Sequence, residues 1–196
     1  NKILPVGAPT MSKKALTYGE KLSTITLSGS MKDGDKEVSG TFVWTEPDAK
    51  LNAGTHQMGW RFTPADSGTY MEASGTVTVV VNKATPTGAP KYTTITTSGK
   101  TLADAALAVN ESWPDGVVQW VDKDGNALPD DTVVEANMTY KWKFTPTDIN
   151  NYNTLEDSIK LYSVSTGGGG GSAVTPPTTT ETETTTDPDG TTTKRE

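Results

Sequence analysis

The sequence contains no cysteine and a single histidine, His56. The absence of cysteine excludes disulfide scaffolds, thiolate zinc sites and cysteine nucleophiles. One histidine excludes multi-histidine metal sites and leaves one candidate base for a serine-based triad. No run approaches the roughly 18 apolar residues that span a bilayer. The net charge of −7 argues against nucleic acid, which needs clustered Lys and Arg. We therefore expect no cofactor, no metal, no nucleic-acid partner and no membrane contact.

The C-terminal end differs in composition from the rest of the chain. Five consecutive glycines, Gly167 to Gly171, precede a Thr/Pro/Glu-rich stretch in which Val174 is the only large aliphatic residue. Such a stretch cannot bury enough apolar surface to offset the entropy lost on ordering. We predict that residues 166–196 are a disordered linker, either a passive spacer or a glycosylated stalk.

Three blocks of sequence occur twice, in the same order. They are NKILPVGAPT (1–10) with NKATPTGAPK (82–91), GTFVW (40–44) with GVVQW (116–120), and WRFTPADSGTY (60–70) with WKFTPTDINNY (142–152). Self-similarity at a nearly fixed period indicates repeated structural units. The sequence predicts two tandem modules, residues 1–82 and 83–165. Because no linker separates them, we expect a stiff joint.

Period-two alternation of apolar residues predicts strands in both modules. In Met138–Phe144 every second residue is large and apolar, and Met58–Phe62 repeats this pattern. Alternation of this kind is typical of a strand with one buried face. The Thr-Pro pairs at 63–64 and 145–146 should end these strands, because proline cannot continue a central ladder. The closing strands are expected at 76–81 and 158–162.

One alanine-rich segment departs from the strand pattern. In residues 102–109, Leu102, Ala106 and Val109 have the spacing of one face of a short helix, whereas the matching segment 21–27 is less helical. We therefore predict a mostly β fold of two tandem small β modules, each an Ig-like sandwich or β-grasp-like. The prediction allows one short helix in each module.

Several of these blocks resemble a known class of module. TYGEKL (17–22), GTH (54–56), GTVTVVVNKA (75–84) and the two FTP-containing blocks resemble the β-grasp-like MBG-type repeats, and their Ig-like relatives, of Gram-positive cell-surface proteins. The resemblance covers residues 1 to about 163, and the second copy departs from it at Ser98, which stands where the first has Tyr18. It implies an extracellular, cell-surface or secreted protein whose modules serve as spacer, adhesin or both, without enzymatic activity.

The residues that stand out as binding candidates lie in two loops of the second module. Trp113 has no counterpart in the first module, and an exposed loop tryptophan is a common platform for stacking on a sugar ring. Asn150, Asn151 and Tyr152 offer polar partners of the right kind. The partner would be a host or cell-wall glycan, or a protein ligand. Alternatively, Trp113 folds over the edge of the module and has no binding role.

Other candidate chemistries have weaker support. His56 has no accompanying nucleophile motif, so we interpret it as a strand residue at the surface. Asp122–Asn126 imitates the start of a calcium loop, but position twelve is Val133 instead of glutamate, so a hairpin turn explains it better. A Lys–Asn isopeptide cross-link is a further hypothesis that sequence alone does not test.

These observations favour a non-catalytic role. We expect a structural or spacer segment of a bacterial cell-surface protein that supports adhesion, monomeric within a longer chain. The alternative is an adhesin module that binds carbohydrate or protein through the loop residues around Trp113.

Overall fold

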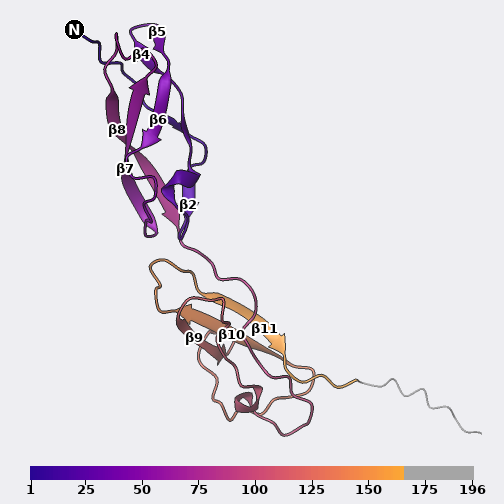
Figure 1. Ribbon diagram of the computed structural model, residues 1–196. Coiled ribbons are helices and arrows are strands. Elements are labelled where there is room, and N and C mark those ends of the chain that lie inside the picture. The colour runs from indigo at the N-terminus through magenta and orange to yellow at the C-terminus, as the bar shows by residue number, and fades with distance from the viewer. Residues whose placement is uncertain (166–196) are drawn as a thin grey trace, which may run out of the picture. The chain divides into compact units, whose positions relative to one another are not determined.

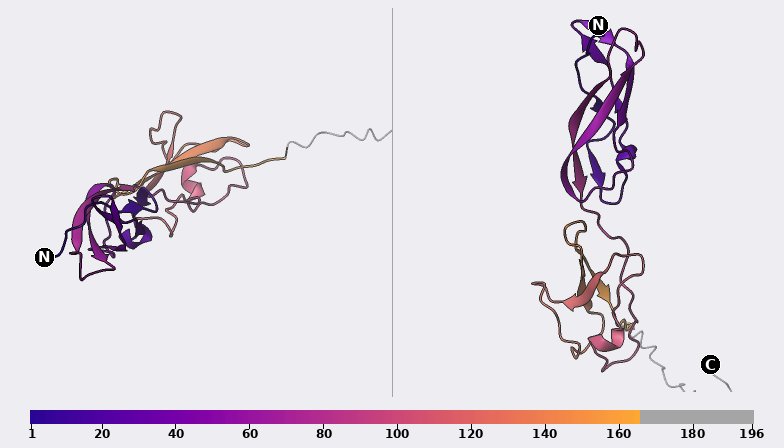
Figure 2. Two further views of the ribbon diagram at one scale, coloured as in Figure 1. Left: turned by 90° about the horizontal axis from the view of Figure 1, so that it is seen from above. Right: turned by 60° about the vertical axis from the view of Figure 1, so that its left-hand side comes forward.

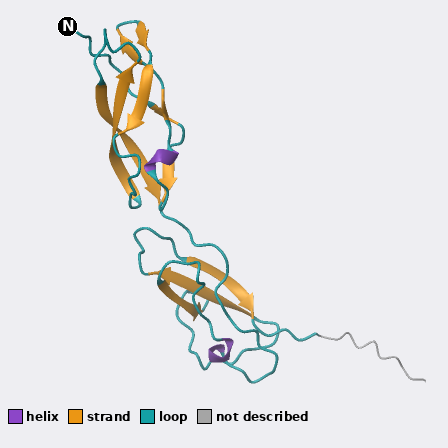
Figure 3. Ribbon diagram, viewed as in Figure 1, coloured by secondary structure: helices purple, strands orange, loops and turns teal. Residues whose placement is uncertain are grey.

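The computed structural model describes residues 1–165, which are built mostly of β-strands (Figure 1, Figure 3). Residues Asn1–Val164 form one compact unit. The two helical elements are 3₁₀ turns of three and four residues, and no helix of this described part is long and apolar enough to cross a membrane. The mostly-β prediction is confirmed, with one short helix in each half of the sequence. The linker predicted at 166–196 lies outside the described residues.

The N-terminal half, residues 1–82, is organised around a four-stranded sheet with the order β2-β8-β7-β6. Its strands are β2 (Ala15–Thr17), β6 (Gly40–Trp44), β7 (Gly54–Pro64) and β8 (Ala73–Asn82). Two-stranded sheets join β1 (Thr10–Met11) to β3 (Leu27–Ser28) and β4 (Met31–Asp33) to β5 (Lys36–Val38), and the turn η1 spans Leu22–Thr24. Among the ladders between the strands of this half, the β2–β8 ladder is parallel and the others are antiparallel. Figure 2 shows the twist of the long strands β7 and β8.

The alternation in the sequence determines which face of β7 is buried. Met58, Trp60 and Phe62 are buried, while the residues between them are exposed or half-buried. Across the ladder, Trp60 lies opposite Trp44 and Phe62 opposite Phe42. Burying a side chain of this size contributes about 1.5–3 kcal/mol, so this cross-strand aromatic set is a main source of stability for the N-terminal half.

The C-terminal half, residues 83–165, contains a three-stranded antiparallel sheet with the order β11-β10-β9. Its elements are η2 (Leu102–Ala105), β9 (Gly116–Val121), β10 (Thr139–Pro146) and β11 (Leu155–Lys160). Trp120, Trp142 and Phe144 are buried together in one cluster. Both long central strands, β7 and β10, end at the proline of their Thr-Pro pair, as predicted.

The predicted helix in 102–109 is much shorter in the structure. Thr101 and Asp104 form a capping box at the start of η2, which satisfies backbone N–H groups that the first turn leaves free. The helix ends at once because Ala106 adopts a left-handed conformation with φ 46°, a common way of terminating a helix. Val109 therefore lies in a loop instead of on a helical face.

Two strand boundaries also differ from the predicted ones. Met138 precedes β10 and is 52% exposed, so it does not belong to the buried alternation that starts at Tyr140. The closing strand of the C-terminal half begins at Leu155 and ends at Lys160. Leu161 is buried immediately after it. Apolar alternation thus located both strands but placed their ends a few residues away.

The two halves share the same hairpin register. The matched cross-strand pairs are Trp44–Trp60 with Trp120–Trp142, Phe42–Phe62 with Val118–Phe144, and Gly40–Pro64 with Gly116–Pro146. The register continues into the next strand, where Ala73 lies opposite Phe62 and Leu155 lies opposite Phe144. The similarity between the two sequences is accompanied by matching backbone geometry.

In each half, the N-terminal segment is held in parallel to the C-terminal segment. Besides the β2–β8 ladder, the parallel bridges are Ile3–Tyr70, Ala84–Tyr152 and Ile95–Tyr162. The Ile3 bridge consists of hydrogen bonds from Ile3 N–H to Thr69 O (2.9 Å) and from Met71 N–H to Ile3 O (2.8 Å). The matching bonds at Ala84 are 2.9 and 2.8 Å long. In each half, the first residues are therefore bridged to the turn before the last strand, and a later N-terminal segment is paired with the C-terminal end.

Candidate functional site

Trp113 lies in the core of the C-terminal half and does not form an exposed platform. Its side chain is only 7% exposed, and its indole N–H donates to Thr87 O at 2.7 Å. The ring stacks on Trp142 with centroids 5.7 Å apart and contacts Phe144 at 4.7 Å. The expectation of an exposed aromatic is corrected here, because both the face and the polar edge of the indole are occupied within the protein.

A comparison of the two halves gives the physical reason for this burial. In the N-terminal half, Phe42 contacts the Trp60 and Phe62 rings, with centroids 5.4 and 4.7 Å apart. The position that matches Phe42 in the register is occupied by Val118, which is smaller. Trp113 contacts the rings that match Trp60 and Phe62, so a loop residue provides the aromatic contacts that a strand residue provides in the other half.

The other three candidate residues lie in the turn that follows β10. Asn150 is exposed, Tyr152 is half-buried, and Asn151 is 6% exposed. Asp148 forms this turn by accepting a hydrogen bond from Asn151 N–H at 3.2 Å. Tyr152 also lines a shallow hollow with Pro114. The structure therefore brings the two predicted loops together, but Trp113 does not line the hollow between them.

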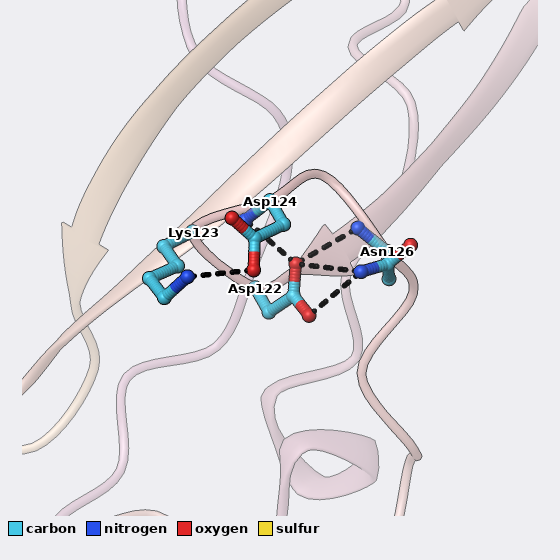
Figure 4. Close-up of polar contacts among 4 residues, drawn as sticks. All are labelled: Asp122, Lys123, Asp124 and Asn126. Atoms are coloured by element: carbon cyan, nitrogen blue, oxygen red, sulfur yellow. Dashed lines mark hydrogen bonds and ion pairs between the residues drawn. The ribbon is translucent and has the colours of Figure 1, made fainter.

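The segment Asp122–Asn126 is a closed turn (Figure 4). One carboxylate oxygen of Asp122, Oδ1, accepts hydrogen bonds from Asp124 N–H at 2.8 Å and Asn126 N–H at 2.9 Å. The other, Oδ2, accepts from the side chain of Asn126 at 3.0 Å. These donors, above all the Asn126 side chain, hold the pKa of Asp122 below its ordinary value. Both carboxylate oxygens are thus engaged by amide groups, as a structural turn requires.

Within residues 1–165, the structure assembles no catalytic, metal-binding or isopeptide site from the remaining candidate residues. His56 lies on β7, where a ring nitrogen is 2.8 Å from Asn52 O. Within this part of the chain, no group of three acidic or histidine residues gathers as metal ligands. The lysines in ion pairs keep between 32% and 86% of their side chains exposed, unlike the buried lysine that an isopeptide bond would use.

Two open hollows, which the sequence does not indicate, occupy matching places in the two halves. In the N-terminal half, a hollow of about 380 Å³ lies between the η1 region and β6, and Ile25, Phe42 and Trp44 line it. In the C-terminal half, one of about 370 Å³ lies between η2 and β9, and Leu102 and Trp120 line it. Both border the edge strand of their sheet. In both halves a 3₁₀ turn precedes a strand that contributes a tryptophan to the hollow.

Comparison with known proteins adds no assignment. No protein family matches the chain, and no curated protein matches it at a significant level.

Proposed function

We propose that this chain is a non-catalytic spacer segment of a bacterial cell-surface protein, which supports adhesion by holding another domain away from the envelope. In this proposal the two halves are two copies of one β module, with the boundary at residues 82–83. The matched registers of the two hairpins support this division. The extracellular location rests on the sequence resemblance described above.

The observation that carries the proposal is the parallel pairing, in each half, of an N-terminal segment with its C-terminal end, in the β2–β8 ladder and in the Ile95–Tyr162 bridge. When tension acts on the two ends of a chain, parallel terminal strands are drawn past one another along their length. Several hydrogen bonds then resist together, whereas an antiparallel pair that is pulled apart from one end loses its bonds one at a time. The β2–β8 ladder in Ala15–Thr17 has this geometry. A spacer at a cell surface needs this resistance to tension.

Single-molecule force measurements test the proposal. The absence of cysteine allows unique cysteine handles at residues 1 and 165, and a second protein carries them at Thr41 and Thr63, which lie opposite each other on β6 and β7. Forced unfolding reports the barrier to unfolding along the pulling direction. We expect a higher unfolding force for the terminal handles than for the Thr41–Thr63 pair. An equal or lower force would contradict the spacer role.

The location is tested separately. Antibodies raised against residues 1–165 should label intact cells of the source bacterium without permeabilisation. Labelling that appears only after permeabilisation would contradict the surface assignment, whatever the force measurements show.

A further inference from the structure

We propose that Tyr18, Asn52 and Ala53 of the N-terminal half and Asn151 and Tyr152 of the C-terminal half form a specific joint that makes the two halves a single rigid body. We call these five residues the joint. This inference concerns the contact between the halves and does not depend on the cell-surface role.

Asn151 is the central residue of the joint. It is the only buried polar residue in residues 1–165. Its side-chain oxygen accepts a hydrogen bond from Ala53 N–H at 2.7 Å. Its side-chain nitrogen donates to Asp148 Oδ2 at 2.8 Å and to Asn52 Oδ1 at 3.3 Å. Because the Ala53 donor and the Asp148 carboxylate face opposite ends of the amide, the amide has only one orientation that satisfies both. A buried amide with every partner in place fixes one arrangement of the groups around it.

An aromatic pair adds a second, independent contact. The Tyr18 and Tyr152 rings meet edge to face, with centroids 5.2 Å apart and an interplanar angle of 81°, which is a favoured geometry for aromatic pairs. Both tyrosines are anchored close to the point where the chain passes between the halves. Tyr18 N–H donates to Asn82 O at 2.9 Å, and Tyr152 is bridged to Ala84.

The connection itself has little freedom. Between Asn82, which ends β8, and Ala84, which is bridged to Tyr152, only Lys83 intervenes. The Lys83 ammonium group donates to Ile149 O at 2.7 Å, in the same turn that holds Asn151. The chain is therefore held to its own half on each side of the connection, which leaves few backbone dihedrals free between the two halves.

The matching positions at the other ends of the two halves show that the joint is a specialised feature. Thr69 matches Asn151, since each precedes the tyrosine of the parallel bridge. Ser98 matches Tyr18 in the sequence repeat. Glu135 matches Asn52, because the bridges Lys21–Lys50 and Thr101–Val133 align the two segments. The two copies therefore differ at Tyr18, Asn52 and Asn151, whereas Tyr152 is matched by Tyr70 and Ala53 by Ala136. The three side chains that differ occur once, at the internal contact, and they specify which half precedes the other.

Hydrogen exchange of the Ala53 amide in the full chain tests the joint directly, because this N–H donates to Asn151 across the contact. We expect a slowly exchanging amide in the wild type. Asn151→Thr, which introduces the residue of the matching position, should speed its exchange at least tenfold. Asn150→Thr, at the exposed neighbour, should leave it unchanged. Unchanged amides in β7 and β10 show in each case that the fold is intact.

A second variant and a second measurement protect the test against a folding defect. Tyr18→Ser removes the aromatic pair from the other half and introduces the residue found at the matching position. NMR relaxation should give one correlation time for both halves in the wild type and two different times in either joint variant. Rapid Ala53 exchange in the wild type, independent tumbling of the wild-type halves, or no effect of both joint variants would overturn the proposal.

Discussion

At the scale of single residues, the closest packing is found at the two glycines that begin β6 and β9. A β-carbon at Gly40 would lie 2.5 Å from Thr63 O and would overlap the Phe62 ring. At Gly116 it would lie 2.5 Å from Thr145 O and 2.6 Å from the Phe144 ring. The obstacle is a backbone oxygen in each case, and this oxygen cannot move without disturbing the ladder. Glycine is therefore required here by the close approach of two strands.

We expect both Gly40→Ala and Gly116→Ala to destabilise the protein, by about 1–3 kcal/mol each, as overpacking of a core does. Chemical denaturation followed by circular dichroism measures the change. The matched controls are Thr41→Ala and Val117→Ala, at the exposed neighbours, which should cost less than about 1 kcal/mol. The matching registers indicate that the two hairpins are equivalent. If one glycine tolerated alanine and the other did not, this equivalence would be contradicted.

Trp113 shows how far single residues could be predicted. In the sequence, Trp113 has no counterpart in the other half. The reason for this extra tryptophan lies at another pair of matching positions, 42 and 118. Because Val118 stands where the other half has Phe42, the rings of Trp142 and Phe144 lack the aromatic contact that Phe42 provides, and Trp113 makes that contact instead. An aligned repeat contains this signal. The exposure of the indole does not follow from the sequence, since it depends on how the loop returns over the sheet.

At the scale of elements, the turn at Asp122–Asn126 is held together by a single carboxylate. The amide donors around Asp122 stabilise its ionised form in the folded state, so its pKa lies below the ordinary value of 3.8. A carboxyl group whose pKa is lowered by folding contributes stability above its unfolded pKa. This contribution is lost as the pH falls through the folded pKa.

We therefore expect the Tm of the wild type to exceed that of Asp122→Asn at pH 6, and the difference to shrink as the pH is lowered from about 4 towards 2.5. Thermal denaturation followed by circular dichroism across this range checks the expectation. Lys123→Ala removes the adjacent surface ion pair with Asp124 and should change the stability by no more than about 0.5 kcal/mol at pH 6. A difference that grew on acidification would be inconsistent with an ionised Asp122.

Elements were predictable where the alternation of apolar residues is long. Residues 58–62 already identify β7, because they place three large apolar side chains at alternate positions, as the buried face of a strand requires. The ends of elements were harder to place. Met138 continues the alternation of β10 in the sequence, yet it lies before the strand. The helical spacing of Leu102 and Val109 gave no indication that Ala106 would adopt a left-handed conformation.

At the scale of the whole molecule, the apolar clusters divide along the chain. One cluster draws only on residues between Ile95 and Tyr162, and the other two draw only on residues between Met11 and Val81. Each half thus buries its own core, and the joint adds mostly polar and aromatic contacts. The sequence offered Asn151 and Tyr152 as candidate ligand-binding residues, but it gave no means of predicting that they contact the other half, because matching strands do not reveal which surfaces meet.

The separate polypeptides 1–82 and 83–165 should each fold cooperatively, since neither core uses residues of the other half. Calorimetry should show a single transition for each, with an enthalpy of about 60 kcal/mol, as expected for a domain of this size. Each should melt below the corresponding transition of the full chain, because the joint is lost. A fragment without a cooperative transition would show that its half is not an independent module.

The burial of the five tryptophans has a practical consequence. Trp44 and Trp60 lie in the N-terminal half, Trp113, Trp120 and Trp142 lie in the C-terminal half, and each is at most 7% exposed. Each half therefore contains its own intrinsic fluorophores in an apolar environment, with emission at short wavelength that shifts to the red when water reaches the indoles. Replacing the two tryptophans of the N-terminal half, or the three of the C-terminal half, by phenylalanine would leave the other half as the only source of tryptophan fluorescence. The opening of each half could then be followed separately, without any attached dye.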